Sequence, residues 1–244
     1  MLAVNAPGWY GKLPSLGDFA SRRLPPEFIE AWDDWLAGGL AEWRAREPTA
    51  WLADYLAGPS WRFMLSPGLL AADDFAWVGV LMPSVDSVGR YFPLTLVQPL
   101  RDLPVSTLQA RALLEWLQRL DDLAADAIQD DWQVDHLERA LERLGPFHQQ
   151  TDQPHALADP LNTGLFEGAP IELAAGADVA AFLAGAARDQ FMHGLRGKAL
   201  WLRNNDRGQP VLRTTAGLPR GRDFSALLKP DKNSAPLSTG EDHA

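Results

Sequence analysis

Residues 77–100 constrain the fold more than any other stretch of this sequence. Two apolar runs, residues 77–82 and 91–97, are rich in β-branched and aromatic residues and are separated by a polar loop at 83–90. This pattern is typical of a β-hairpin whose strands pair directly. Neither run alternates apolar with polar residues, and strands of this composition are usually covered on both faces. The sequence therefore predicts a sheet that carries helices on each side.

Further strand patterns extend this sheet. Residues 61–65 form one, and Arg62 should face away from Trp61 and Phe63 because side chains alternate along a strand. Residues 198–203 and 209–214 form a second hairpin, with Pro210 requiring a strand start or an edge. Most connections between the first strands are too short for parallel crossovers. We predict an α/β (α+β) fold, a layered sandwich with a central, mostly antiparallel sheet and helices on both faces.

Helical signals separate these strands. The expected helices are one from Pro25 through Trp43, one at residues 49–57 capped by Thr49, one opening at Pro104 with Ser106 and Gln109 in capping-box spacing, one at residues 132–144, and one from Asp178 to Gly194. In the first helix a stripe of Trp residues predicts a core-facing side, and Gly38 and Gly39 predict a close backbone approach or a bend. In the third, the apolar face is expected at Leu108, Ala112, Trp116, Leu120 and Leu123.

These elements predict one domain over residues 1–228. It comprises residues 1–145, an extended connection at 146–177, and a helix with the C-terminal hairpin at 178–228. Residues 229–244 have too little apolar surface to fold and are expected to be a disordered tail.

The composition excludes several classes of function. The net charge of −10 argues against nucleic acid or an anionic membrane as a partner. The absence of cysteine excludes disulfides, thiolate metal sites and a cysteine nucleophile. No signal-peptide pattern and no apolar segment of about 20 residues is present, so a cytoplasmic protein without membrane insertion is expected. The 10 Trp residues are expected to fill the core.

No catalytic motif is complete. Gly11-Lys12 lacks the remainder of a phosphate-binding loop, and Lys12 and Asp18 are expected to be solvated or paired with each other. Ser84 lacks the nucleophile-elbow motif, which leaves a hydrolase using Ser84 as an alternative. A second alternative is a metal site at His148 and His155, with Asp152 and Asp159 at suggestive spacing. We expect no enzyme activity, no cofactor and no metal.

Four separated motifs resemble the TagF (ImpM) family of type VI secretion accessory proteins. They are, in order, GWYGKLPSLGDF from residue 8, RLPPEFIEAWDDWL from 23, SWRFML from 60 and GVLMPSVDSVGRYFPLT from 79. ALWL near Leu200 and GLPRGRDFSALL from Gly217 resemble the closing segment of the family. The resemblance implies a cytoplasmic, non-enzymatic repressor that acts after translation on assembly or firing of the secretion machine. It also implies a forkhead-associated-domain scaffold protein as partner. A structural component of the apparatus is a further alternative.

The polar residues of these motifs are the candidate partner-binding site. We hypothesise that they converge at one end of the sheet as a charged patch framed by aromatic side chains. The patch consists of Lys12, Asp18, Arg62, Ser84, Asp86 and Arg90, framed by Trp9, Tyr10 and Phe92. The alternative is that Arg90 pairs with Asp86 or Asp18 in a buried structural pair that shapes the loop.

Overall fold

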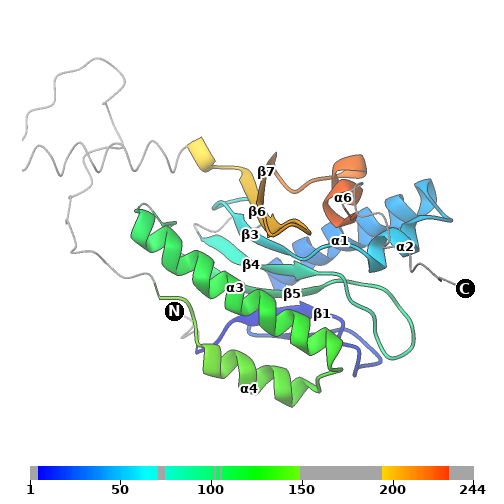
Figure 1. The fold of residues 1–244 in the computed structure, drawn as a ribbon, viewed down its shortest axis with the longest axis horizontal. Coiled ribbons are helices and arrows are strands. Elements are labelled where there is room, and N and C mark those ends of the chain that lie inside the picture. The colour runs from blue at the N-terminus through cyan, green and yellow to red at the C-terminus, as the bar shows by residue number, and fades with distance from the viewer. Residues whose placement is uncertain (1–4, 71–74, 102, 105, 149–193, 231–244) are drawn as a thin grey trace, which may run out of the picture.

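A seven-stranded antiparallel sheet organises the described part of the protein (Figure 1). The structure, a computed structural model, describes residues 5–70, 75–101, 103–104, 106–148 and 194–230. The strand order is β2-β1-β5-β4-β3-β6-β7, and every neighbouring pair is antiparallel. The strands are β1 (Gly8–Gly11), β2 (Ala20–Arg22), β3 (Trp61–Leu65), β4 (Ala76–Met82), β5 (Leu94–Leu100), β6 (Lys198–Asn204) and β7 (Pro210–Ala216). The predicted antiparallel α/β sandwich is thus confirmed.

The β4–β5 hairpin lies at the centre of the sheet, as its buried sequence predicts. Both strands are almost entirely buried, and Ala76 to Met82 pair in register with Leu100 to Leu94. The second strand begins later than expected, because Tyr91 forms only an isolated bridge to Val85 and the Phe92 N–H donates to the Ser84 carbonyl. The connection therefore spans residues 83–93 rather than 83–90.

One face of the sheet is covered by α1 (Pro26–Arg46), α2 (Trp51–Leu56) and α6 (Gly221–Leu228). The Trp stripe of α1 faces this core, as predicted, and in the whole protein eight of the 10 Trp residues are buried. Gly39 accommodates the ring of Phe224, since a Cβ there would lie 2.5 Å from it. The close approach at Gly39 therefore involves a side chain from α6 and not the backbone that we expected.

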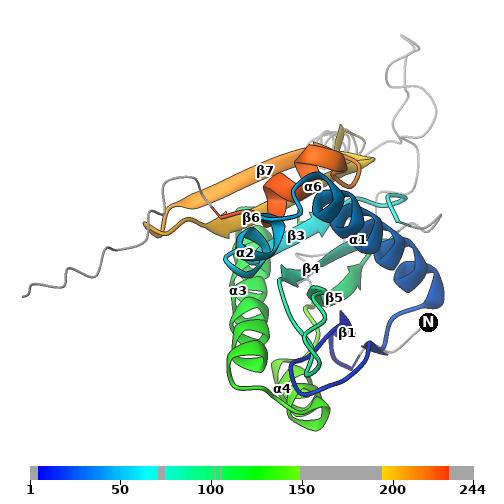
Figure 2. The same cartoon turned by 90° about the vertical axis from the view of Figure 1, so that its right-hand side faces the viewer.

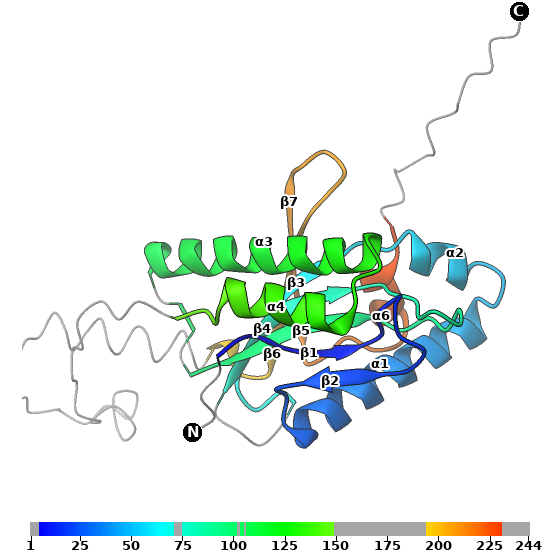
Figure 3. The ribbon, with the colours of Figure 1, turned by 90° about the horizontal axis from the view of Figure 1, so that it is seen from below.

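The other face is covered by α3 (Thr107–Gln129) and α4 (Val134–Leu144), which lie side by side (Figure 3). Figure 2 shows α1 and α3 on opposite sides of the sheet. The predicted cap of α3 is present, with the Ser106 hydroxyl accepting from the Gln109 N–H. The predicted apolar face is partly wrong: Leu108 is 61% exposed, and the helix buries Leu113 and Leu117 instead.

Of the remaining predictions about helices and strands, some are confirmed and others are wrong or lie outside the described residues. Thr49 is not a cap, because α2 follows Ala50 and has no side-chain cap. The C-terminal hairpin is confirmed, with Pro210 at the start of the outermost strand β7. The sequence missed β2, which has only three residues, and α6. The expected helix before Gly194, most of the 146–177 connection and most of the 229–244 tail lie outside the described residues. No described helix is long and apolar enough to span a membrane.

Candidate protein-contact site

Two loops meet at one end of the sheet and form what we call the two-loop platform. The first loop, residues 12–19, follows β1, and the second, residues 83–93, joins β4 to β5. Gly11 places them together: its φ is +130°, and a Cβ at this position would lie 2.1 Å from the Pro93 carbonyl oxygen. Only glycine adopts this conformation at such close range. The glycine that ends β1 therefore fixes how the two loops meet.

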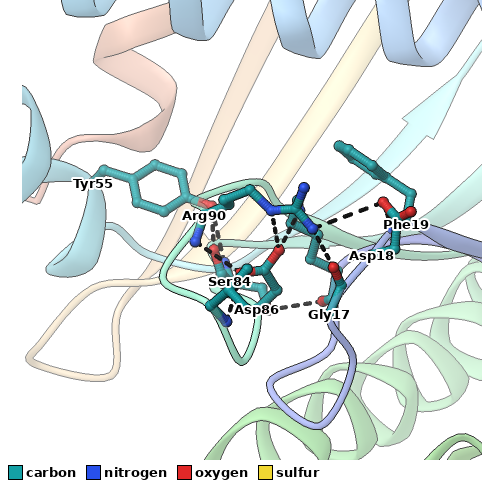
Figure 4. A network of polar contacts seen from close by, with 9 residues as sticks. Gly17, Asp18, Phe19, Tyr55, Ser84, Asp86 and Arg90 are labelled. Carbon is teal, nitrogen blue, oxygen red and sulfur yellow. Dashed lines mark hydrogen bonds and ion pairs between the residues drawn. The ribbon is translucent and has the colours of Figure 1, made fainter.

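A buried ion pair joins the two loops beneath their surface, at the Asp86 carboxylate that is labelled in Figure 4. The Lys12 Nζ lies 2.5 Å from the Asp86 Oδ2, and the two side chains are 3% and 0% exposed. The Asp86 carboxylate also accepts hydrogen bonds from the backbone N–H groups of Val88 and Arg90 and from the Arg90 Nε. Asp86 is therefore the centre of the contact between the loops.

The environment of Asp86 keeps its carboxylate ionised. Burial by itself raises the pKa of a carboxyl group, because it penalises the charged form. Here the hydrogen bonds from the Lys12 ammonium and from the Arg90 backbone and side chain outweigh burial, and the pKa of Asp86 lies well below its usual range. Neutralising one partner of a buried pair leaves the other as an uncompensated buried charge, which destabilises the fold.

Arg90 continues the network to the surface. Its guanidinium donates to the Gly17 carbonyl in the first loop and lies 3.8 Å from the Asp18 carboxylate. The Ser87 N–H donates to the Leu16 carbonyl at 3.0 Å, a second link between the loops. The Arg90 side chain is 52% exposed, so it connects the buried pair to the outer face of the platform.

Tyr55 of α2 fixes the start of the second loop. Its hydroxyl donates to the Ser84 carbonyl and accepts from the Ser84 N–H, both at 2.9 Å. Burial raises the pKa of Tyr55 well above its usual range, so the hydroxyl keeps the proton that it donates. The Ser84 hydroxyl donates to the Lys12 carbonyl at 2.8 Å. These contacts satisfy the backbone of a loop segment that is buried.

The outer face of the platform combines apolar and charged groups. Phe19 is 43% exposed and Val88 is 66% exposed. The Phe19 ring packs edge-on against Phe92 at 4.8 Å and lies 4.3 Å from the Lys12 Nζ. The exposed residues are Gly17, Asp18, Phe19, Ser87, Val88, Gly89 and Arg90. An exposed aromatic ring beside an arginine, on a backbone fixed from below, is typical of a protein contact surface.

The predicted site residues divide between this platform and other places. Lys12, Ser84, Asp86, Tyr10 and Phe92 are buried within or beneath it, and only Asp18 and Arg90 are exposed. The expected pairing of Lys12 with Asp18, or with solvent, is wrong, because Lys12 pairs with Asp86. The structural alternative is correct in its partners, because Arg90 contacts both Asp86 and Asp18. It is wrong in its burial, because the Arg90 side chain is 52% exposed and that of Asp18 is 82% exposed.

Arg62 and Trp9 do not join the platform. Arg62 faces away from Trp61 and Phe63, as predicted, and its guanidinium donates to the Gln118 side chain of α3 at 2.6 Å. The Trp9 indole is fully buried on the α3 and α4 side and donates to Glu138 at 2.6 Å. Neither side chain is exposed to a partner in this conformation.

Three further residues of the platform, Phe19, Val88 and Tyr55, are not indicated by the sequence motifs. Phe19 and Val88 are apolar residues next to polar loop residues, and that juxtaposition was a usable signal of an exposed contact. Tyr55 gave no signal, because its contact with Ser84 crosses 29 residues of chain.

The surroundings of Ser84 and of the histidines bear on the two enzyme alternatives. No histidine is among the contacts of Ser84 within the described residues. His148 is exposed, whereas His155, Asp152 and Asp159 lie outside the described residues. No group of metal-binding side chains occurs in the described part of the chain.

The fold and the platform define a class: an antiparallel α/β sandwich that presents two loops, joined by a buried ion pair, at one end of its sheet. Residues 8–144 match the TagF N-terminal domain, described as type VI secretion system-associated. The chain belongs to this family, and the resemblance seen in its motifs is confirmed. It is also similar to the crystal structure of PA0076 from Pseudomonas aeruginosa PAO1, with 31% identity over 97% of this chain and 100% of that chain, and a TM-score of 0.65. Comparison with curated proteins finds no match.

Proposed function

We propose that this protein is a non-enzymatic accessory regulator of type VI secretion. In this proposal it represses assembly or firing of the machine after translation, in the cytoplasm, through contacts with a forkhead-associated-domain scaffold protein. Family membership supports the association with type VI secretion. The observation that carries the protein-contact mechanism is the two-loop platform, where exposed Phe19, Val88 and Arg90 lie on a network anchored by the buried Lys12–Asp86 pair.

The construction of the platform favours binding. Ordering flexible side chains and loops costs affinity, so a surface held in place before contact binds more tightly than a mobile one. Here the two loops are linked through Asp86, through Arg90 and through Ser87, and Tyr55 fixes the second loop to α2. The exposed face is thus prepared for a partner.

The hydrolase alternative lacks a supporting observation at Ser84. A nucleophilic serine needs a general base within hydrogen-bond reach. The Ser84 hydroxyl instead donates to the Lys12 carbonyl, and the side chain is buried. We therefore propose a contact role for this region and no chemical step.

Val88 offers the sharpest test of the platform. Its side chain is 66% exposed, so Val88→Glu changes the surface and leaves the ion pair intact. Arg90 is less suitable, because its Nε binds Asp86 and its charge reversal would alter the loop as well. A matched control is Leu108→Glu, at a 61% exposed leucine where α3 starts, at the end of the sheet away from the platform (Figure 1).

The experiment combines binding with secretion. In affinity capture, the wild type and Leu108→Glu should retain the scaffold protein. Val88→Glu should retain about tenfold less of the scaffold protein, because a charge in the core of a contact surface is unfavourable. Overproduced wild type and Leu108→Glu should lower the release of a secreted component into the medium, whereas Val88→Glu should not. Unchanged secretion on overproduction of the wild type would reject repression. A fixed stoichiometric assembly with the apparatus would instead support a structural component.

A further inference from the structure

The outer edge of β7 lies at one end of the strand order. Among the described strands β7 has a neighbour on one side only, β6. It is seven residues long, whereas β2 at the opposite edge has three. Proteins usually block long edges with lysine, bulges or a covering element, because an open edge can pair with another strand. β7 contains no lysine, and its one proline is at its first residue.

The pairing with β6 determines which backbone groups of β7 point outward. Hydrogen bonds run from the Asn205 N–H to the Gln209 carbonyl and from the Gly217 N–H to the Gly197 carbonyl. In an antiparallel ladder, bonded residues alternate with residues whose N–H and C=O point away from the partner. Gln209 and Gly217 are bonded residues, so the residues at odd positions between them point toward β6. The N–H and C=O groups of Leu212, Thr214 and Ala216 therefore point outward. They can accept an added strand.

The side chains beside this edge are apolar on one face. Leu212 is 66% exposed, and its cross-strand neighbour Leu202 is half-buried, as is Leu200 opposite Thr214. Residues opposite each other in adjacent strands lie on the same face of the sheet. An added strand would therefore find apolar contacts as well as backbone hydrogen bonds.

The segment that contains this edge has a charge opposite to that of the chain as a whole. The protein carries 22 basic and 32 acidic residues, yet residues 194–230 contain eight basic residues and two acidic ones. The exposed cations of this region are Arg196, Lys198, Arg207, Arg220 and Arg222. None of these five forms an ion pair within the described part of the chain. Lys198 is opposite Ala216 at one end of the edge, and at the other end Arg207 lies beside Asp206 in the turn before Pro210.

We propose that the β7 edge binds an extended acidic segment of another protein by strand addition. The outward backbone groups supply the hydrogen bonds, and the surrounding cations select the acidic sequence. A second copy of this chain is disfavoured as the occupant, because edge-to-edge pairing would bring two cationic hairpins together. The inference does not depend on the proposed repression of secretion, since its test uses the purified protein alone.

The test measures binding of a fluorescein-labelled synthetic peptide in which glutamate alternates with valine. Fluorescence anisotropy should show binding that weakens as salt is added. The same peptide with lysine in place of glutamate should not bind, and a version with N-methylated valines, which lose their backbone donors, should bind about tenfold more weakly. Hydrogen exchange of the Leu212, Thr214 and Ala216 amides should slow in the presence of the acidic peptide.

A matched pair of variants locates the site. Thr214→Pro removes an outward N–H, a change that edge strands tolerate, and should weaken binding about tenfold, whereas Thr214→Ala keeps the N–H and should bind as the wild type does. If Thr214→Pro fails to fold by circular dichroism, the double variant Lys198→Glu with Arg207→Glu replaces it, with the same expected loss.

Three results would overturn the inference. The first is acidic-peptide binding that the variants and the N-methylated peptide leave unchanged, or no binding at all. The second is a dimer of the free protein in sedimentation equilibrium that buries the edge. The third is tight binding of a single-stranded oligonucleotide that depends on Lys198 and Arg207 but not on the Thr214 N–H. That outcome would assign the cations to nucleic acid.

Discussion

Removing the Tyr55 hydroxyl should destabilise the protein without changing its surface. In Tyr55→Phe the Ser84 carbonyl keeps the Phe92 N–H as a donor, but the Ser84 N–H loses its partner. A net hydrogen bond is worth about 1 kcal/mol, and an unpaired buried donor costs about 1–3 kcal/mol. We therefore expect the free energy of unfolding to fall by about 2 kcal/mol.

The neighbouring Tyr91 supplies the control. Its ring packs against Tyr55 and Trp51, but no hydrogen bond joins its hydroxyl to the described residues. Tyr91→Phe should change the unfolding free energy by less than about 0.5 kcal/mol. Urea denaturation measures both values, and amide exchange at Ser84 should accelerate only in Tyr55→Phe. Equal effects of the two substitutions, or a loss below about 0.5 kcal/mol in Tyr55→Phe, would refute the role assigned to this hydroxyl.

Two further stability predictions follow from the core and the platform. Gly39→Ala should lower the unfolding free energy by about 1–3 kcal/mol, because the added Cβ would collide with the Phe224 ring. Gly38→Ala should raise the unfolding free energy by up to about 1 kcal/mol, because no atom lies within 4 Å of the added Cβ and alanine favours the helix. Thermal denaturation that moves both variants in the same direction would contradict this. The pKa of Asp86 is lowered in the folded state, so its contribution is present above the unfolded pKa of about 4 and is lost as the pH falls below it. The difference in unfolding free energy between the wild type and Asp86→Asn should therefore shrink from about pH 7 to pH 3, and a difference independent of pH would argue against the ion pair with Lys12.

The sequence predicted those parts of the fold that depend on local pattern. The central hairpin, the Trp stripe of α1 and the Ser106 cap are all readable from residues within a few positions of one another. β2 has only three residues, too few for alternation to show, and it is a strand because β1 offers an edge to it. The exposure of Leu108 could not be predicted, because the periodicity of α3 fits two overlapping faces and packing against the sheet chooses between them.

The sequence indicated some of the residues that meet at the platform but not how they are arranged. The motifs singled out Lys12, Asp86 and Arg90, and the structure brings these three together directly or through a shared carboxylate. Which acidic residue pairs with Lys12 depends on the Gly11 conformation and on contacts across 74 residues of chain. The alternation of side chains along β3 predicted that Arg62 lies on the face of the sheet away from Trp61. It did not predict that Arg62 lies apart from the loop residues, because that depends on the position of α3, where Gln118 accepts its hydrogen bond.

The position of β3 affects how the chain can fold during synthesis. β3 pairs with β4 on one side and with β6 on the other. The partner β6 is distant in sequence, since the contact between Ser66 and Lys198 spans 132 residues. At the usual pace of translation the ribosome needs on the order of 10 s to supply that partner. Throughout this interval the nascent chain exposes one side of β3, together with the hydrophobic surface that Trp201 later covers. The region matched by the family, which ends at residue 144, is therefore expected to aggregate when produced alone, and a soluble fragment must include β6.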